Sequence, residues 1–296
     1  MASSPPEIRG QRFLDNKGRP ALEAVGLPRA PMRDLYHRLV IARWSSFLAG
    51  CLVVYTLLHV LFGALYTLAP GCVSNVEGFW DAYFFSVQTM MTIGYGTMSP
   101  VTTYAHVLVS IEAYLGMFLT AVLTGLVFAK FATPTANVMF ADVICIARHE
   151  GKPTLSMRVA NARGNRLVSA SLDIAIAKTI RTQEGETFRK VVDLQLVRRT
   201  NPLFWVGWTA MHVIDETSPF YGETVESLTQ KGMEMIVILT GIDEHTSQTV
   251  HARRSYGADE IRWGARYVDL IAAAQTTGGL RRVDYRRFHE TQPAPL

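Results

Sequence analysis

A run of five residues, Thr92-Ile93-Gly94-Tyr95-Gly96, has the composition of a backbone site for a dehydrated cation. Its two glycines permit backbone angles that a Cβ would penalise, so consecutive carbonyl oxygens can point toward one axis. Thr92 can add its hydroxyl oxygen at the inner end of the run. Stacked rings of such oxygens can replace the hydration shell of a bare monovalent cation. Because one loop supplies only a quarter of each ring, this chemistry predicts an assembly of four chains.

The segments around this run must hold it in place. An isolated Gly-Tyr-Gly is often only a surface turn. Here residues 79–91 contain no Pro or Gly and predict a re-entrant helix that leads into the loop. Apolar segments at about 46–69 and about 105–130 are each long enough to cross a hydrocarbon core of roughly 30 Å. Since irregular backbone is tolerated at membrane depth inside protein, we predict a transmembrane pore domain at 45–132, with a pore helix at 79–91 and a filter at 92–96.

The charges follow the pattern of a membrane protein. The chain has 296 residues, of which 49% are hydrophobic, and a net charge of +4. Residues 1–44 carry eight Lys or Arg and four Asp or Glu, whereas residues 70–104 carry no Lys or Arg. The excess of basic residues predicts that the N-terminus and Lys130 face the cytoplasm, which puts both termini on that side. The balanced charge of the C-terminal half argues against a basic groove for nucleic acid.

Two ionisable residues interrupt the apolar segments. His59 could be a proton or ligand site, but a neutral histidine bonded to a neighbouring helix is the favoured hypothesis. Glu112 is costly in lipid and is therefore expected to face protein or water. The three cysteines, Cys51, Cys72 and Cys145, form no disulfide framework or metal-ligand spacing. We expect no cofactor beyond ions in the filter.

The second apolar segment predicts the lining of an aqueous path. Its residues Gly116, Thr120, Thr124 and Phe128 recur at a spacing of four and share one helix face. Thr120 and Thr124 are expected to line a cavity. Phe128 could close the path by dewetting, or serve as an interfacial anchor. Gly116 and Gly125 could each act as a hinge or allow close helix packing, and the sequence does not choose between these roles.

Residues 31–44 precede the first span and predict an amphipathic helix in the inner membrane interface. Its cations, together with one at the end of the second span, could bind anionic lipid headgroups; they are Arg33, His37, Arg38, Arg43 and Lys130. The alternative is positive-inside anchoring without regulation. Residues 1–30, which include Ser3-Ser4-Pro5-Pro6, predict a flexible tail.

Residues 133–296 predict a soluble, strand-rich domain. Apolar and polar residues alternate at 155–159, 172–177, 193–196 and 235–239, and turn signals centred on Gly164 and Gly185 separate these runs. Short strands spaced by turns favour an antiparallel sandwich. The sequence carries no nucleotide-binding glycine fingerprint, no HExxH and no Gly-x-Ser-x-Gly, so no enzyme is predicted. His149, Glu150, Asp243, Glu244 and His245 are expected to be solvated.

Three groups of residues resemble the inward rectifier potassium channels, and most closely their prokaryotic branch. The first runs from Phe84-Phe85-Ser86-Val87-Gln88-Thr89 into the filter run, which matches the Thr-Val-Gly-Tyr-Gly filter of potassium channels with Ile in place of Val. The second is Trp208-Thr209-Ala210-Met211-His212-Val213-Ile214-Asp215-Glu216-Thr217-Ser218-Pro219. The third comprises His251-Ala252-Arg253-Arg254-Ser255-Tyr256 and Ile261-Arg262-Trp263. The likeness covers about 30–290.

The resemblance implies a potassium-selective homotetramer, in which each chain has three identical partners, in a bacterial inner membrane. It implies K⁺ bound at Thr92, Ile93, Gly94 and Tyr95, and an immunoglobulin-like cytoplasmic domain. It also implies one gate at Phe128, at the helix-bundle crossing, and a second gate, the G-loop, at Gly241 and Ile242. Phosphoinositides regulate the family, with basic residues at the inner membrane face involved.

The chain departs from the eukaryotic members of that family at two functional positions. They carry a Glu behind the filter paired with an Arg just after it, where this chain has Gln88 and Met98. Strong rectifiers carry a cavity Asp that holds polyamines or Mg²⁺, where this chain has Thr120. We therefore expect no such filter brace and weak intrinsic rectification, unless Asp243 or Glu244 supplies a binding site, with Ba²⁺ as a pore blocker. The alternatives are a non-selective cation channel on the same scaffold and a membrane-anchored enzyme or receptor.

Overall fold

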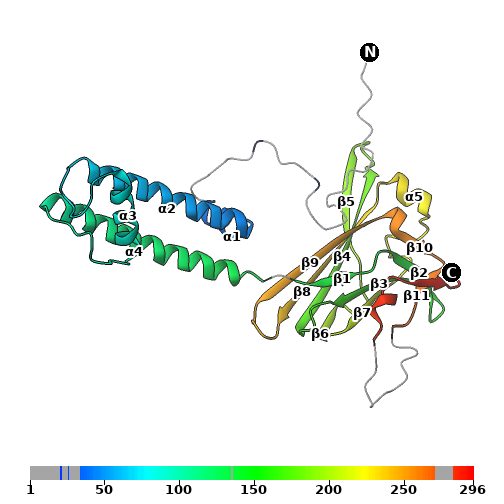
Figure 1. Cartoon of the computed structure of the whole chain (residues 1–296). Helices are drawn as coiled ribbons and strands as arrows, with labels where there is room; N and C mark the ends of the chain where they lie inside the picture. The colour runs from blue at the N-terminus through cyan, green and yellow to red at the C-terminus, as the bar shows by residue number, and fades with distance from the viewer. Residues whose placement is uncertain (1–20, 22–25, 27–33, 135, 271–282) are drawn as a thin grey trace, which may run out of the picture. The chain divides into compact units, whose positions relative to one another are not determined.

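The computed structural model describes residues 21, 26, 34–134, 136–270 and 283–296. The chain divides into a helical unit, residues 27–133, and a unit that contains the strands, residues 134–296 with 1–26. Each unit is coloured along the chain in Figure 1. The predicted tail at 1–30, apart from residues 21 and 26, lies outside the described residues, and so does Arg33.

The described residues of the helical unit form four helices. They are α1 (Leu35–Ile41), α2 (Trp44–Thr67), α3 (Phe79–Met90) and α4 (Thr103–Phe131). Both α2 and α4 are long and apolar enough to cross a membrane, and most of their large apolar side chains are exposed in the single chain. Lipid and neighbouring protein are the solvents that such surfaces need. The predicted spans and pore helix therefore correspond to α2, α4 and α3.

Helix α1 is shorter than the predicted interfacial helix. Ala42 has a ψ of 154°, which ends α1, and Trp44 is the first residue of α2 rather than the last of α1. At the other side of the unit, α3 lies between the ends of α2 and α4 (Figure 1). A buried cluster that includes Phe62 and Tyr66 of α2 and Phe85 of α3 joins the helices there.

The second unit is a two-layer β-sandwich. Its first ten strands are β1 (Val138–Phe140), β2 (Ile144–His149), β3 (Lys152–Asn161), β4 (Leu167–Arg181), β5 (Thr187–Asp193), β6 (Thr200–Phe204), β7 (Gly207–Val213), β8 (Glu234–Asp243), β9 (Thr249–Gly257) and β10 (Ile261–Trp263). One sheet has the order β1-β3-β2-β10 with β7 beside β3, and the other has the order β5-β4-β8-β9 with β6 beside β4. Strands β11 (Ala265–Tyr267) and β12 (Thr291–Pro293) form a separate pair, and α5 (Val225–Gln230) is the one α-helix of this unit among the described residues.

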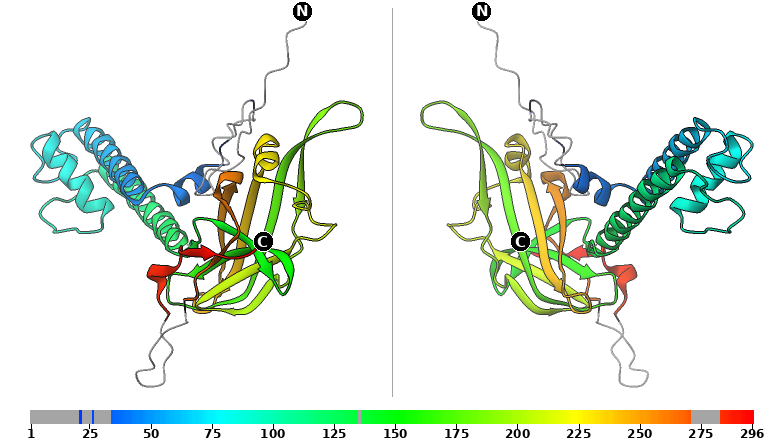
Figure 2. Two further views of the ribbon diagram at one scale, coloured as in Figure 1. Left: turned by 90° about the vertical axis from the view of Figure 1, so that its right-hand side faces the viewer. Right: turned by 90° about the vertical axis from the view of Figure 1, so that its left-hand side faces the viewer.

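Alternating side chains build the core between the sheets. Leu172, Ile174 and Ile176 of β4 and Met235 of β8 are each at most 2% exposed. Residues two apart in a strand share one face, so each strand presents one apolar face to the interior. The β4–β5 hairpin extends beyond the rest of its sheet (Figure 2). The predicted β-sandwich is confirmed.

Two details of the sandwich differ from the prediction. Strand β10 pairs with β2 in parallel, so the sheets are not wholly antiparallel. The predicted strand at 193–196 is wrong, because β5 ends at Asp193. Leu194 is nevertheless buried in the core, and its amide donates to the carbonyl of Ile174. The alternation there therefore reflects a buried connection between strands.

Candidate functional site: the filter and the helices that hold it

The filter run continues directly from the end of α3. The amides of Ile93 and Gly94 both donate to the carbonyl of Gln88, at 2.8 and 3.3 Å, and the amide of Thr92 donates to Thr89 at 3.1 Å. These bonds fold the first filter residues back onto the last turn of the pore helix. The position of α3 consequently sets the position of the filter backbone.

Every second filter residue has a left-handed backbone. The φ angles are 57° at Thr92, 55° at Gly94 and 83° at Gly96. Glycine adopts these angles freely, whereas a β-branched threonine is an outlier there and is strained by about 1–3 kcal/mol. The residue types predict the left-handed backbone at the two glycines but not at Thr92. Strain of this kind is concentrated at functional sites, and the alternation is what allows successive carbonyls to face one way.

The chain that leaves the filter is fixed to the segment that precedes the pore helix. Asn75 Nδ2 donates to the carbonyl of Thr97 at 2.6 Å. The amide of Ser74 donates to the carbonyl of Ser99 at 2.8 Å, and Val73 forms an isolated β-bridge with Pro100. This is a brace of backbone and amide groups without an ion pair. Gln88 and Met98 cannot supply a Glu–Arg pair to this brace.

The residues predicted to line the cavity lie along α4. Thr120 Oγ1 donates to the carbonyl of Gly116 at 2.9 Å, and Thr124 Oγ1 donates to the carbonyl of Thr120 at 2.8 Å. Thr120 Oγ1 also lies 3.4 Å from the hydroxyl of Tyr55 in α2, which must be the donor in that contact. Both threonines are exposed in the single chain. Phe128, further along α4, is 74% exposed in the single chain. Its side chain is therefore not part of the packing within one chain.

The two candidate hinges differ in their surroundings. A Cβ added at Gly116 would lie 2.8 Å from the carbonyl oxygen of Met90, whereas a Cβ at Gly125 would meet nothing within 4 Å. Gly116 is therefore required for the close approach of α4 to the end of α3. Contacts within the single chain therefore do not require glycine at position 125.

Lys130, near the C-terminal end of α4, joins that helix to the end of α1. The residue is 8% exposed, and its ammonium donates to the carbonyl of Val40 at 2.9 Å and to that of Ala42. It also lies 5.3 Å from the ring centroid of Trp44, a cation–π distance. Lys130 thus caps the C-terminal end of α1 from α4. His37, Arg38 and Arg43 are the exposed members of the predicted lipid set among the described residues.

Gly241 and Ile242 lie in β8, opposite Val250 and Thr249 of β9. The solvated state expected for Asp243 is wrong, because this carboxylate is 5% exposed. It accepts hydrogen bonds from the amides of His245 and Thr246 and from the side chain of Asn165. Burial alone would raise the pKa of Asp243, but these hydrogen bonds together lower it below its ordinary value. The network fixes the turn that follows β8.

The signature run at 208–219 comprises most of β7 and the loop that follows it. His212 contacts the carbonyl of Gln195 at 2.7 Å and the hydroxyl of Ser218 at 2.8 Å. Ser218 is 7% exposed, and its oxygen also accepts from the amide of Phe220. Because both groups are buried and bonded, they order the loop and offer no accessible nucleophile.

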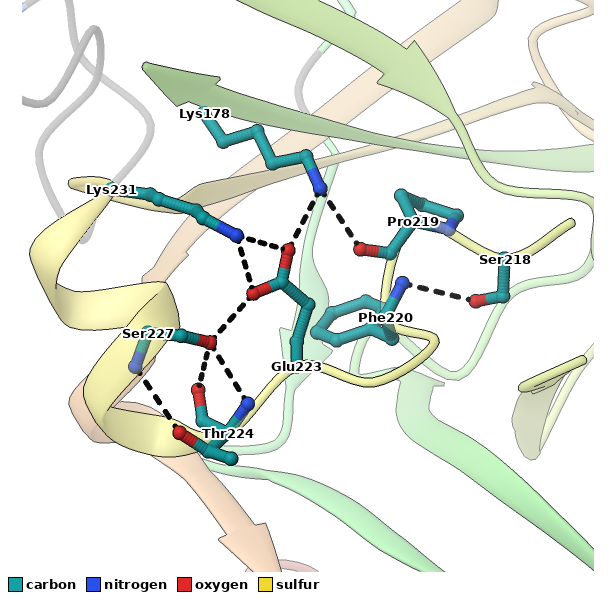
Figure 3. Close-up of polar contacts among 8 residues, drawn as sticks. All are labelled: Lys178, Ser218, Pro219, Phe220, Glu223, Thr224, Ser227 and Lys231. Atoms are coloured by element: carbon teal, nitrogen blue, oxygen red, sulfur yellow. Dashed lines mark hydrogen bonds and ion pairs between the residues drawn. The ribbon is translucent and has the colours of Figure 1, made fainter. Parts of the chain in front are cut away.

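Glu223 anchors the same loop to the sheet (Figure 3). Its carboxylate lies 3.0 Å from Lys178 Nζ and 2.7 Å from Lys231 Nζ, and Ser227 Oγ donates to it at 2.6 Å. Burial opposes ionisation, but the two ammonium groups and the hydroxyl lower the pKa of Glu223 to about 2. Thr224 adds a capping box at the start of α5. Glu223 therefore links β4 to both ends of α5.

The fold and the site together define a membrane ion channel with two spans and a re-entrant filter. Profiles of the inward rectifier potassium channel transmembrane domain and C-terminal domain match residues 67–134 and 138–296. The chain is 40% identical over 288 residues to the inward rectifier potassium channel Kirbac3.1 of Paramagnetospirillum magnetotacticum, with 96% of this chain and 97% of that protein covered. It belongs to the inward rectifier potassium channel family and is a potassium channel in a membrane.

More distant relatives agree with this assignment. The bovine G protein-activated inward rectifier potassium channel 1 is 31% identical over 98% of this chain and 63% of its own length. The mouse G protein-activated inward rectifier potassium channel 3 is 32% identical over 99% of this chain and 81% of its own length. A solved structure of Spo0M, a sporulation control protein from Bacillus subtilis, matches 42% of this chain and 48% of its own at 10% identity with a TM-score of 0.24, too low to bear on fold or function.

Proposed function

We propose that four copies of this chain form one potassium-selective pore, in which K⁺ is bound by oxygens of Thr92, Ile93, Gly94 and Tyr95. The observation that carries this proposal is the alternation of left-handed residues along the filter. Two further features support it. The filter residues are exposed in the single chain, as an incomplete ring requires, and the filter starts at the C-terminal end of α3, where the helix dipole favours cations.

The pore is closed at two constrictions, one at Phe128 and one at the G-loop residues Gly241 and Ile242. The exposure of Phe128 supports the first constriction. Four phenylalanine rings on a shared axis exclude water and hence hydrated ions. Gly125 and Gly116 lie above Phe128 on the same helix, and only Gly125 has the free space that a hinge needs.

Anionic lipid headgroups, phosphoinositides among them, modulate this gate through the basic residues of the inner interface. The exposed cations His37, Arg38 and Arg43 bind the headgroups, together with Arg33. Lys130 then transmits the movement of α1 to α4, since it joins the end of α1 to the turn that follows Phe128. Charge attraction to anionic lipid is worth about 1 kcal/mol per basic residue near the surface.

Rectification is weak, because Thr120 offers a hydroxyl in place of a carboxylate to polyamines or Mg²⁺. Asp243 is a poor substitute, since three hydrogen bonds already occupy its carboxylate. Ba²⁺ blocks by occupying the filter. The chain resides in a bacterial inner membrane with both termini in the cytoplasm, as the basic N-terminal residues support.

The test is rubidium uptake into liposomes that contain the purified protein and an outward potassium gradient. We expect uptake that Ba²⁺ abolishes and that Na⁺ does not match, with a rate that changes when phosphoinositide is added. Phe128→Ala is expected to increase basal uptake. Equal uptake of Na⁺ and Rb⁺ would refute the selective pore, and an unchanged rate across all lipid compositions would refute the lipid modulation.

A further inference from the structure

A carboxylate is buried in the middle of the second membrane span. Glu112 of α4 is 0% exposed, and both of its oxygens accept hydrogen bonds from hydroxyl groups. Carboxylates are rare at this depth, because removal from water is costly unless donors compensate for it. A group kept at such cost invites a functional explanation.

The donors to Glu112 come from the two other long helices of the unit. Tyr66 of α2 donates its phenolic proton to Oε2 at 2.7 Å, and Ser86 of α3 donates its hydroxyl proton to Oε1. Ser86 has only one proton, so His59 Nδ1, 3.1 Å from Ser86 Oγ, must be the donor in that contact. The favoured hypothesis for His59, a bond to a neighbouring helix, is confirmed. The hydrogen bonds therefore run from His59 to Ser86 and from Ser86 to Glu112. Tyr66 donates a further hydrogen bond to the other oxygen of Glu112.

This hydrogen-bonded network includes Ser86 of α3, the helix that leads into the filter. Ser86 lies two residues before Gln88, whose carbonyl accepts the amides of both Ile93 and Gly94. A shift of Ser86 would therefore also move the carbonyl of Gln88, which accepts hydrogen bonds from the filter backbone. Hydrogen bonds to an ionised acceptor are about twice as strong as neutral ones, so Glu112 is well suited to fix the rotation and depth of α3.

We propose that Glu112 is a positioning residue for ion selectivity. It holds the pore helix from behind through Ser86, with Tyr66 and His59 as its supports. Gln88 and Met98 cannot form an ion pair that would brace the filter. The contact from Glu112 of α4 to Ser86 of α3 braces the pore helix instead. Selectivity depends on filter carbonyls held at a set spacing, and a loosened pore helix admits Na⁺.

The inference rests on the proposed coordination of K⁺ at 92–95, and the experiment separates the two. Full-length protein in liposomes is assayed for Rb⁺ and Na⁺ uptake, and the uptake ratio is compared among variants. Glu112→Leu fills a similar volume but accepts no hydrogen bond, and the ratio is expected to fall by roughly tenfold or more, as for the loss of one charge-assisted bond. Glu112→Gln keeps one acceptor oxygen and is expected to restore part of the ratio.

Variants that remove one hydroxyl donor to Glu112 at a time are compared with a control variant that removes a hydroxyl elsewhere. Tyr66→Phe and Ser86→Ala each remove one hydroxyl and should lower the ratio by about threefold or more, while Tyr66→Phe added to Glu112→Leu should have no further effect. Tyr104→Phe is the control, because the Tyr104 hydroxyl donates at 2.9 Å to the carbonyl of Leu65 and not to Glu112. Its ratio should equal that of the unmodified channel.

The outcomes divide clearly. An assembled Glu112→Leu channel with an unchanged ratio overturns the proposal. If that variant does not assemble, unchanged ratios in both Tyr66→Phe and Ser86→Ala overturn it instead, and lowered ratios support it. An unmodified channel that fails to discriminate Rb⁺ from Na⁺ would refute the coordination at the filter and, with it, the role of Glu112.

Discussion

Substitution of Gly116 by alanine tests whether this glycine is needed for packing or for bending. An added Cβ would lie 2.7 Å from Met90 Cγ and 2.8 Å from the carbonyl oxygen of Met90. The side chain of Met90 can rotate away, but its carbonyl belongs to the last turn of α3. Relief of the second contact therefore requires a backbone shift of several tenths of an ångström, two residues before Thr92.

The net cost follows from two opposing effects. Overpacking of a close contact costs about 1–3 kcal/mol. Replacement of a glycine inside a helix by alanine returns up to about 1 kcal/mol. With the full gain subtracted, we therefore expect Gly116→Ala to destabilise the helical unit by up to about 2 kcal/mol. Gly125→Ala should gain the helix propensity of alanine without a steric cost inside the single chain, because nothing lies within 4 Å of its Cβ position.

The assay combines thermal dissociation of the purified oligomer with rubidium uptake. We expect Gly116→Ala to lower both the midpoint temperature and the selective uptake. Gly125→Ala should keep the midpoint or raise it. A Gly116→Ala channel with the midpoint and uptake of the unmodified protein would refute the packing argument. A variant that loses uptake while its midpoint stays the same or rises would instead indicate a hinge at Gly116.

Three further predictions concern other sites. Lys130→Met removes the ammonium that caps α1, at a cost of about 1–3 kcal/mol, and should accelerate amide hydrogen exchange in residues 35–42; unchanged exchange there would contradict the capping role. Thr120→Asp places a carboxylate in the cavity and should strengthen voltage-dependent spermine block by tenfold or more, whereas equal block would show that polyamines do not reach this position. Glu223 has a folded pKa of about 2, below its ordinary 4.5, so its stabilising effect, at most about 3 kcal/mol, is complete above about pH 4.5 and is lost as the pH falls toward 2. Glu223→Gln should therefore lower the thermal midpoint at pH 7 and flatten its dependence on pH between 4.5 and 2, and a profile parallel to that of the unmodified protein would count against the ion pairs.

The sequence alone determined the features that depend on composition and local order. Apolar length marks α2 and α4 as spans, because the thickness of a bilayer fixes how many residues must be apolar. The spacing of Gly94 and Gly96 identifies the filter, because few residue types accept a left-handed backbone. Alternation with a period of two gives the sandwich, although at 193–196 the same alternation belongs to a buried connection.

Only the tertiary structure decided which distant side chains meet. Tyr66, Ser86 and Glu112 lie on three different helices, and no local pattern places a serine of the pore helix against a glutamate 26 residues later. The sequence predicts Lys130 as one of the lipid-binding cations, yet in the structure it is buried and donates to a carbonyl 90 residues earlier in the chain. Buried polar groups must find partners, but which partner each one finds depends on how the helices pack, and that is a property of the assembled fold.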